Sequence, residues 1–284
     1  MKYFSMFSGV EGFGQGINGE LMGFSEIDKY ASMVLKYRFP NIINYGDCSK
    51  IRWEEIPDFD LLTGGSPCQD FSIAGKRRGL ASSKSALAWE FIRGLRSKQP
   101  RYFIWENVKG VMSSRSGWDF ANIITAFSES GYSLWWQVLN AKDFGVPQNR
   151  ERIFVIGFRE GSPKEIFFEF KTEENSLEES GTICKTLLAS YPANSNGNFI
   201  KVGDNIRKLT EIECERLMSW PDDWTRWGRK TDKECLNCAI NQQVGSKQQG
   251  CSVCVVEISD SQRYKMCGNG VVSNVIKEIV KLFQ

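Results

Sequence analysis

Short apolar runs alternate with amphipathic stretches over the first 157 residues, and this alternation constrains the fold more than any other feature. The strand-like runs are residues 3–7, 23–27, 42–45, 60–63, 102–105, 133–139 and 152–157. The helix-like stretches are residues 29–37, 86–96 and 119–130. Strands that alternate with helices build a mostly parallel sheet covered on both faces. The pattern therefore predicts an α/β, Rossmann-type domain over residues 1–157.

The rest of the chain is organised differently. From residue 158 to 205 the periodicity fades and eight acids face five basic residues, which indicates a small separate lobe. A helix should follow, because Thr210 and Glu213 have the spacing of a capping box. We assign residues 158–226 to this lobe and its connecting helix. The remaining regions are a cysteine-bearing insertion at 227–261 and a segment at 262–284, which carries a final amphipathic helix.

The chain contains nine cysteines and no histidine. The absence of histidine excludes Cys-His and Ser-His nucleophile pairs and the His-containing zinc site of nucleobase deaminases. No apolar run approaches the ~18 residues that a membrane span needs, and the N-terminus lacks the pattern of a signal peptide. We therefore expect a cytoplasmic protein whose cysteines are thiols or metal ligands rather than disulfides.

Glycines and acids follow the first three predicted strands. Gly9 and Gly12 belong to a turn that opens a helix, where a ligand can approach the backbone closely. Glu26 ends the second strand, where an acid of this fold can bind ribose hydroxyls, and Asp47 ends the third. Each acid alone would more often cap a helix. Together the three strand ends predict a nucleoside-type cofactor site.

A cysteine follows the fourth predicted strand. Residues 64–72 read Gly-Gly-Ser-Pro-Cys-Gln-Asp-Phe-Ser and place Cys68 on a stiff loop. An arbitrary cysteine is more often a buried core residue, but the loop position makes core packing a poor explanation. Because no histidine is present, nearby cations or backbone dipoles must favour the thiolate, and Lys76, Arg77 and Arg78 follow closely.

Charged residues suited to substrate binding mark three further positions. Glu106 ends a strand and would direct its carboxylate to the same cleft, although an unpaired Glu there is usually just solvated. Arg150 and Arg152 could brace that carboxylate or grip a phosphate, or they could form a surface ion-pair cluster. Residues 72–101 hold eight Lys and Arg against the single acid Glu90, which suits phosphates but also a solvated loop and helix face.

Taken together, these segments resemble the DNA cytosine-C5 methyltransferase family. The likeness covers residues 3–157, resumes at 207–224 and closes at 264–276, where Gly-Asn-Gly-Val-Val resembles the last motif of the family. The order and spacing of Pro-Cys-Gln, Glu-Asn-Val and Gln-x-Arg-x-Arg carry it. The resemblance implies a Rossmann-like, S-adenosylmethionine-dependent methyltransferase domain with a small target-recognition lobe, acting on double-stranded DNA.

The resemblance also implies a mechanism. Cys68 would add to cytosine C6 while Glu106 protonates or hydrogen-bonds N3, so that C5 can attack the methyl-sulfonium of the cofactor. Loss of the C5 proton would release Cys68. The target base should be flipped out of the duplex, because its reactive atoms are otherwise inaccessible. Arg150 and Arg152 would flank the flipped base.

Further roles are implied only by the same resemblance. Phe7 would pack on the cofactor and Ile27 on its adenine. The implied cofactor-binding residues are Phe7, Gly9, Gly12, Glu26, Ile27, Asp47 and Asn269, and the implied DNA-binding residues are Gln69, Ser72, Lys76, Arg77 and Arg78. The sequence departs from the family at Ser5, where an acid is common.

The insertion contains two Cys-x-x-Cys pairs, Cys235 with Cys238 and Cys251 with Cys254, separated by twelve residues. This spacing suits a tetrahedral zinc site, and four protein ligands make such a site structural. The recognition span at 158–205 has only 48 residues and is net acidic by three. The zinc element could therefore supplement DNA contacts, or it could simply staple a loop.

Two other functions remain open. One is an RNA cytosine-C5 methyltransferase, because a related branch uses this catalytic set on transfer RNA. The other is a non-enzymatic DNA-binding relative, against which the retention of Cys68, Glu106 and both arginines argues. We further expect a monomer of bacterial or phage origin, for which a restriction enzyme sharing the same site is a candidate partner.

Overall fold

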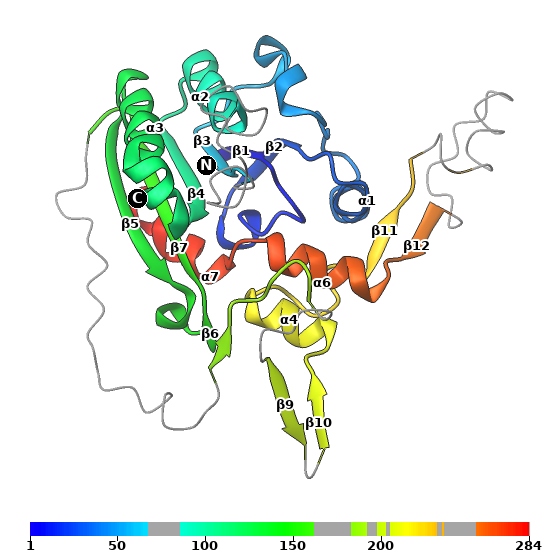
Figure 1. Cartoon of the computed structure of the whole chain (residues 1–284). Helices are drawn as coiled ribbons and strands as arrows, with labels where there is room; N and C mark the ends of the chain where they lie inside the picture. The colour runs from blue at the N-terminus through cyan, green and yellow to red at the C-terminus, as the bar shows by residue number, and fades with distance from the viewer. Residues whose placement is uncertain are drawn as a thin grey trace, which may run out of the picture.

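The computed structural model describes residues 1–67, 86–161, 183–191, 198–202, 205–231, 235 and 254–283. A six-stranded sheet with the order β2-β1-β3-β4-β7-β5 forms its centre (Figure 1). The strands are β1 (Lys2–Met6), β2 (Glu20–Ser25), β3 (Leu61–Gly65), β4 (Tyr102–Val108), β5 (Ser133–Asn140) and β7 (Glu151–Phe158). The first four strands are parallel, and β7 is antiparallel to both of its neighbours. The predicted Rossmann-like α/β class is confirmed.

Helices cover both faces of this sheet. The long ones are α1 (Lys29–Arg38), α2 (Ala86–Lys98), α3 (Trp118–Glu129), α6 (Asp260–Asn269) and α7 (Ser273–Val280). Successive residues of a strand point to opposite faces. Leu61 and Ile104 accordingly join the core formed with α1 and α7, while Leu62 and Phe103 join the core formed with α2 and α3. The sheet is therefore buried on both sides, as its apolar strands require.

Smaller elements lie beside the carboxyl edge of the sheet. They are β6 (Gln148–Asn149) with β8 (Cys184–Lys185), β9 (Phe199–Val202) with β10 (Asn205–Lys208), α4 (Glu211–Leu217), and β11 (Trp227–Arg229) with β12 (Val255–Glu257). The 3-10 turns are η1 (Gly14–Gly16), η2 (Cys48–Lys50), η3 (Trp53–Glu55), η4 (Lys109–Gly117), η5 (Ala141–Phe144) and η7 (Lys281–Phe283). Figure 1 shows the β9–β10 hairpin extending away from the sheet below α4, and β11–β12 on the side of α1.

The capping box is confirmed, because Thr210 Oγ1 accepts from Glu213 N at 3.3 Å and Glu213 accepts from Thr210 N at 2.7 Å. The strand predicted at 42–45 is wrong. Only one isolated bridge, between Phe24 and Asn44, forms beside β2, so no ladder develops. Helix α6 was not predicted from sequence, because it buries the charged Arg263 and its apolar periodicity is weak. Among the described residues, no helix is both long and apolar enough to cross a membrane.

Candidate active site

A cavity of about 410 Å³ opens at the carboxyl ends of β1 to β4, where ligands bind in open α/β sheets. Its wall combines two groups of residues. One comes from the loops after β1 and β2 and from the residue before η2. It includes Phe7, Gly9, Glu26, Ile27 and Asp47. The other comes from β4, the start of β7 and the residue before β7, and includes Glu106, Val108, Arg150 and Arg152. Lys265, Gly268 and Asn269 of α6 also line the cavity. We call the first group the cofactor wall and the second the base wall, with α6 closing the space between them.

The loop after β1 is held in an unusual backbone conformation. Phe7, Gly9 and Glu11 have positive φ angles of 53°, 56° and 65°. Only glycine adopts this region without steric cost, so Phe7 and Glu11 must be held there by the surroundings. Glu26 contributes directly, because its carboxylate accepts from Gly9 N at 2.7 Å and from Asp28 N at 2.7 Å. Burial raises the pKa of Glu26, against the pull of these N–H groups.

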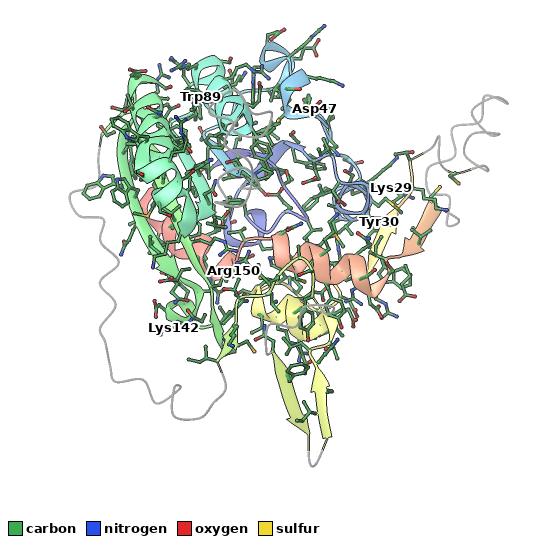
Figure 2. All side chains as sticks on the ribbon, in the orientation of Figure 1. Lys29, Tyr30, Asp47, Trp89, Lys142 and Arg150 are labelled. Carbon is green, nitrogen blue, oxygen red and sulfur yellow. The ribbon has the colours of Figure 1, made fainter. Side chains whose placement is uncertain are left out.

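Apolar and acidic side chains line the rim of the cofactor wall. Ile27 is 77% exposed although its side chain is apolar, and it lies between Glu26 and Asp28 in the sequence. Asp47, labelled in Figure 2, caps η2 and accepts from Ser49 N at 3.0 Å and from Ser49 Oγ at 2.8 Å. These hydrogen bonds lower the pKa of Asp47. The exposed Ile27 together with the carboxylates of Glu26 and Asp47 fits an adenosine. The adenine ring needs apolar cover, and the hydroxyl and amino groups need hydrogen-bond acceptors.

An ion pair joins α6 to the cofactor wall. Lys265 Nζ lies 2.6 Å from Asp28 Oδ2, and Asp28 also caps α1 by accepting from Tyr30 N and Ala31 N. Burial acts to raise the pKa of Asp28, but Lys265 and the backbone N–H groups of Ala31 and Tyr30 together outweigh it, and the pKa is lowered. Asn269, at the end of the same helix, lines the cavity. Lys265 was missed, since nothing in the sequence relates it to a residue 237 positions away.

Glu106 and Arg152 form the centre of the base wall. Arg152 Nε lies 3.1 Å from Glu106 Oε1, and only 13% of the Glu106 side chain and 16% of the Arg152 side chain are exposed. Burial raises the pKa of Glu106, while the charges of Arg152 and Arg150 oppose the rise. Glu106 is therefore not a solvated strand end. The geometry matches the interpretation in which arginine braces the carboxylate.

Arg150 has a different role from Arg152. It is buried, and its guanidinium donates to the carbonyl oxygens of Leu187, Gly268 and Gly270 at 3.2, 3.2 and 2.6 Å. Figure 2 labels it between the sheet and the helices below. Because its donors serve backbone oxygens, Arg150 fixes the end of α6 against the segment that carries Leu187. A surface ion-pair cluster, the alternative considered from sequence, is wrong for both arginines.

Gly12 does not line the cavity. A Cβ at this position would lie 2.9 Å from the Val271 oxygen and 3.1 Å from the Trp220 ring, so close packing requires a glycine there. Gly12 can therefore affect ligand binding only by shaping the loop after β1, because it does not contact the cavity.

Two cations in the described part of the basic stretch bond to other groups of the protein. Arg93 donates to Glu90, to the Ile51 oxygen and to the Cys48 oxygen at 2.7, 2.9 and 2.8 Å. Lys98 donates to the Ile56 oxygen at 2.8 Å. Arg93 and Lys98 therefore attach helix α2 to the rest of the domain.

Several predicted site residues lie outside the described residues. They are Cys68, Gln69, Ser72, Lys76, Arg77, Arg78, Cys238 and Cys251. The chain approaches Cys68 along the cavity, since Ser66 and Pro67 line it. Trp105 Nε1 donates to Ser66 Oγ at 3.1 Å and Asn107 Nδ2 donates to the Ser66 oxygen at 3.2 Å, which fixes the start of this loop.

Cys235 and Cys254 are both buried at the base of the β11–β12 hairpin. The Cys254 oxygen accepts from Lys230 N at 2.9 Å, and Cys235 N donates to the Thr231 oxygen at 3.1 Å. The outer members of the two pairs are thus bonded to Lys230 and Thr231, the two residues that follow β11. Within the described ranges, no three potential ligands gather into a metal site, but two of the four cysteines lie outside these ranges.

The family model described as C-5 cytosine-specific DNA methylase matches residues 1–201, and the chain belongs to this family. Orphan methyltransferase M.SPRI of Bacillus phage SPR is 44% identical over 56% of this chain, which spans only 38% of the phage protein. Type II methyltransferase M.NgoBI of Neisseria gonorrhoeae is 39% identical over 78% of this chain and 83% of its own length. The structure of a methyltransferase of Entamoeba histolytica, EhMeth, shares the fold with a TM-score of 0.73 at 17% identity, over 99% of this chain and 97% of that one.

Proposed function

We propose that this protein is a DNA (cytosine-5-)-methyltransferase that transfers a methyl group from S-adenosylmethionine to C5 of a flipped-out cytosine in a specific sequence of double-stranded DNA. One observation carries the proposal. A single cavity joins strand ends suited to an adenosine to the buried Glu106–Arg152 pair. A methyl transfer needs both substrates in one space, and the family membership supports this chemistry.

The cofactor wall fits S-adenosylmethionine. Glu26 would hold the ribose, Ile27 would cover the adenine and Asp47 would accept from its amino group. Phe7 and Asn269 would flank the remainder of the molecule. The cofactor supplies an electrophilic methyl group, so the protein has to activate only the cytosine.

Cys68 and Glu106 would perform that activation. The Cys68 thiolate forms a bond to C6 while Glu106 gives or shares a proton at N3, and the electron pair moves to C5, which takes the methyl group. S-adenosylhomocysteine would be the by-product of the transfer. The C5 proton would then pass to water, its electron pair would form the C5–C6 double bond as the C6–sulfur bond breaks, and the thiolate would return while N3 gives its proton back to Glu106. A raised pKa suits Glu106 to this task because it lets the carboxyl hold a proton, and Arg152 fixes its orientation.

The loop after Pro67 would supply the DNA contacts through Gln69, Ser72, Lys76, Arg77 and Arg78. Arg93 and Lys98 of α2 donate to the protein itself, so the loop would supply most of the charge for phosphates. The lobe at 158–226 would read the sequence. The protein would act as a monomer, with a restriction enzyme of the same specificity as a candidate partner.

Methylome sequencing of DNA from a host that expresses the protein tests the proposal. Modified cytosines should appear in one sequence context, and Cys68→Ser should abolish them while DNA binding of the purified variant persists. Parallel assays on transfer RNA separate the RNA alternative. Undiminished methylation by Cys68→Ser would refute the covalent mechanism.

We also propose that Cys235, Cys238, Cys251 and Cys254 hold a structural zinc ion. The two described cysteines support this, since both are buried and both are attached to the end of β11. Metal analysis of the purified protein should find about one zinc per chain. Cys238→Ser with Cys251→Ser should then change DNA affinity if the element contacts DNA through neighbours such as Arg229 and Lys230. A loss of stability alone identifies a staple, and an active protein free of metal would refute the site.

A further inference from the structure

The loop after β1, residues 7–13, is called the cofactor loop. It is held in part by residues that follow it by more than 200 positions in the sequence. Trp224 Nε1 donates to the Val10 oxygen at 2.8 Å, and Ser273 Oγ donates to the Gly12 oxygen at 2.7 Å. Both oxygens belong to the turn that contains the strained Phe7 and Glu11. A strained backbone persists only where its surroundings over-determine it. These two donors are therefore candidates for what keeps the loop in shape.

Trp224 is itself firmly placed. The Arg38 guanidinium lies 4.5 Å from the centre of its ring, and Arg38 Nε donates to the Trp224 oxygen at 3.0 Å. Phe39 packs edge-on against the same ring, with centroids 6.1 Å apart. The indole is thus clamped against the end of α1, whose other end begins at the rim of the cavity.

The loop that carries Trp224 is anchored on its other side. Arg263 of α6 lies 3.2 Å from the buried Glu215 and 3.3 Å from Asp223. Glu215 also accepts from Thr225 N at 2.8 Å. Breaking such a buried network is costly, so the position of Trp224 is fixed independently of any ligand.

We infer that Trp224 is a positioning residue for the cofactor: it holds the Val10 carbonyl so that Phe7 and Gly9 present the shape that S-adenosylmethionine binds. Trp224 does not line the cavity, and it acts through the loop. The inference rests on the proposed cofactor site. It assigns a part in cofactor binding to the segment after α4, which belongs to the region proposed as the recognition lobe.

Trp224→Phe tests the inference, because phenylalanine keeps an aromatic ring for Arg38 and Phe39 but lacks the N–H donor. Loss of one hydrogen bond should raise the dissociation constant of S-adenosylmethionine roughly threefold to tenfold, measured by calorimetry on the full chain. The KM for the cofactor should rise equally, while kcat at saturating cofactor and the KM for DNA stay within twofold. Ser273→Ala should shift cofactor affinity in the same direction.

Trp227→Phe is the matched control. This neighbouring tryptophan stacks with Arg226 at 5.2 Å and does not line the cavity, so cofactor affinity should not change. Unchanged affinity in both Trp224→Phe and Ser273→Ala, with only a lower melting temperature, would overturn the inference and leave a purely structural contact. Failure of the wild-type protein to bind the cofactor would instead refute the proposed function, and the inference with it.

Discussion

The two walls of the cavity treat their carboxylates differently. On the cofactor wall, Glu26 is fixed by two backbone N–H groups and Asp47 by a serine at the start of a turn. On the base wall, Glu106 is fixed by one side chain, Arg152. Burial raises the pKa of both Glu26 and Glu106, but two backbone N–H groups hold Glu26 as an acceptor, whereas the groups that oppose the rise at Glu106 are the side chains of Arg152 and Arg150. The difference indicates that the cofactor wall is a rigid binding surface and that the base wall carries the carboxyl group that can change its protonation state.

Glu106→Gln should break the base wall alone, and it should have the largest effect. The amide keeps the shape of the side chain but cannot deliver a proton to N3, so kcat should fall by roughly 10²–10⁴. The dissociation constant of the cofactor should stay within twofold. Steady-state transfer of labelled methyl groups and calorimetry measure the two quantities. A parallel loss of cofactor affinity would contradict the division into two walls.

Glu11→Gln examines an exception on the cofactor side. Glu11 is fully buried, and burial raises the pKa of its carboxyl to about 7, although the N–H of Gly14 pulls the other way. Because this pKa lies above the ordinary value of 4.5, the folded protein binds more protons than the unfolded chain between these limits. The free energy of unfolding therefore falls as pH rises from about 4.5 to about 7.

The variant should remove this loss, which is on the order of 3 kcal/mol if the whole shift acts on stability. Its melting temperature should exceed that of the wild type at pH 8, and the two should converge near pH 5. Thermal unfolding at both pH values measures the difference. A gain of equal size at both would show that the charge of Glu11 is not responsible.

Glu26→Gln should give the smallest of the three effects. The amide has one oxygen where the carboxylate has two, so the N–H groups of Gly9 and Asp28 cannot both be served. Cofactor affinity should fall about tenfold, while kcat at saturating cofactor stays within threefold. Titration with S-adenosylhomocysteine provides the measurement. A lower kcat with unchanged affinity would place Glu26 on the reacting side instead.

The sequence was most informative where function and fold depend on local pattern. The alternation of strands and helices predicts the sheet, and the strand ends locate Glu26 and Glu106 on the two cavity walls. Asp47 also lines the cavity, although the strand predicted before it does not form. The capping box at Thr210 was readable because both partners lie within one helical turn.

Contacts between segments that are distant in the sequence could not be predicted from it. The same motif suggested similar roles for Arg150 and Arg152, but the carbonyl oxygens that Arg150 serves belong to residues 37, 118 and 120 positions away. Lys265 and Trp224 were missed for the same reason. Residues 42–45 have the composition of a strand, yet pairing with β2 stops after a single bridge. Local propensity does not reveal how far a partner extends.

The hydrogen bonds from Trp224 and Ser273 to the cofactor loop have a consequence for the order of synthesis. β1 and its loop are translated before the donors that hold Val10 and Gly12, which follow more than 200 residues later. A nascent chain can form the sheet early, while its cofactor loop lacks both supports. A chain that ends before Trp224 lacks both donors, so the loop after β1 should be less firmly held in it than in the full chain.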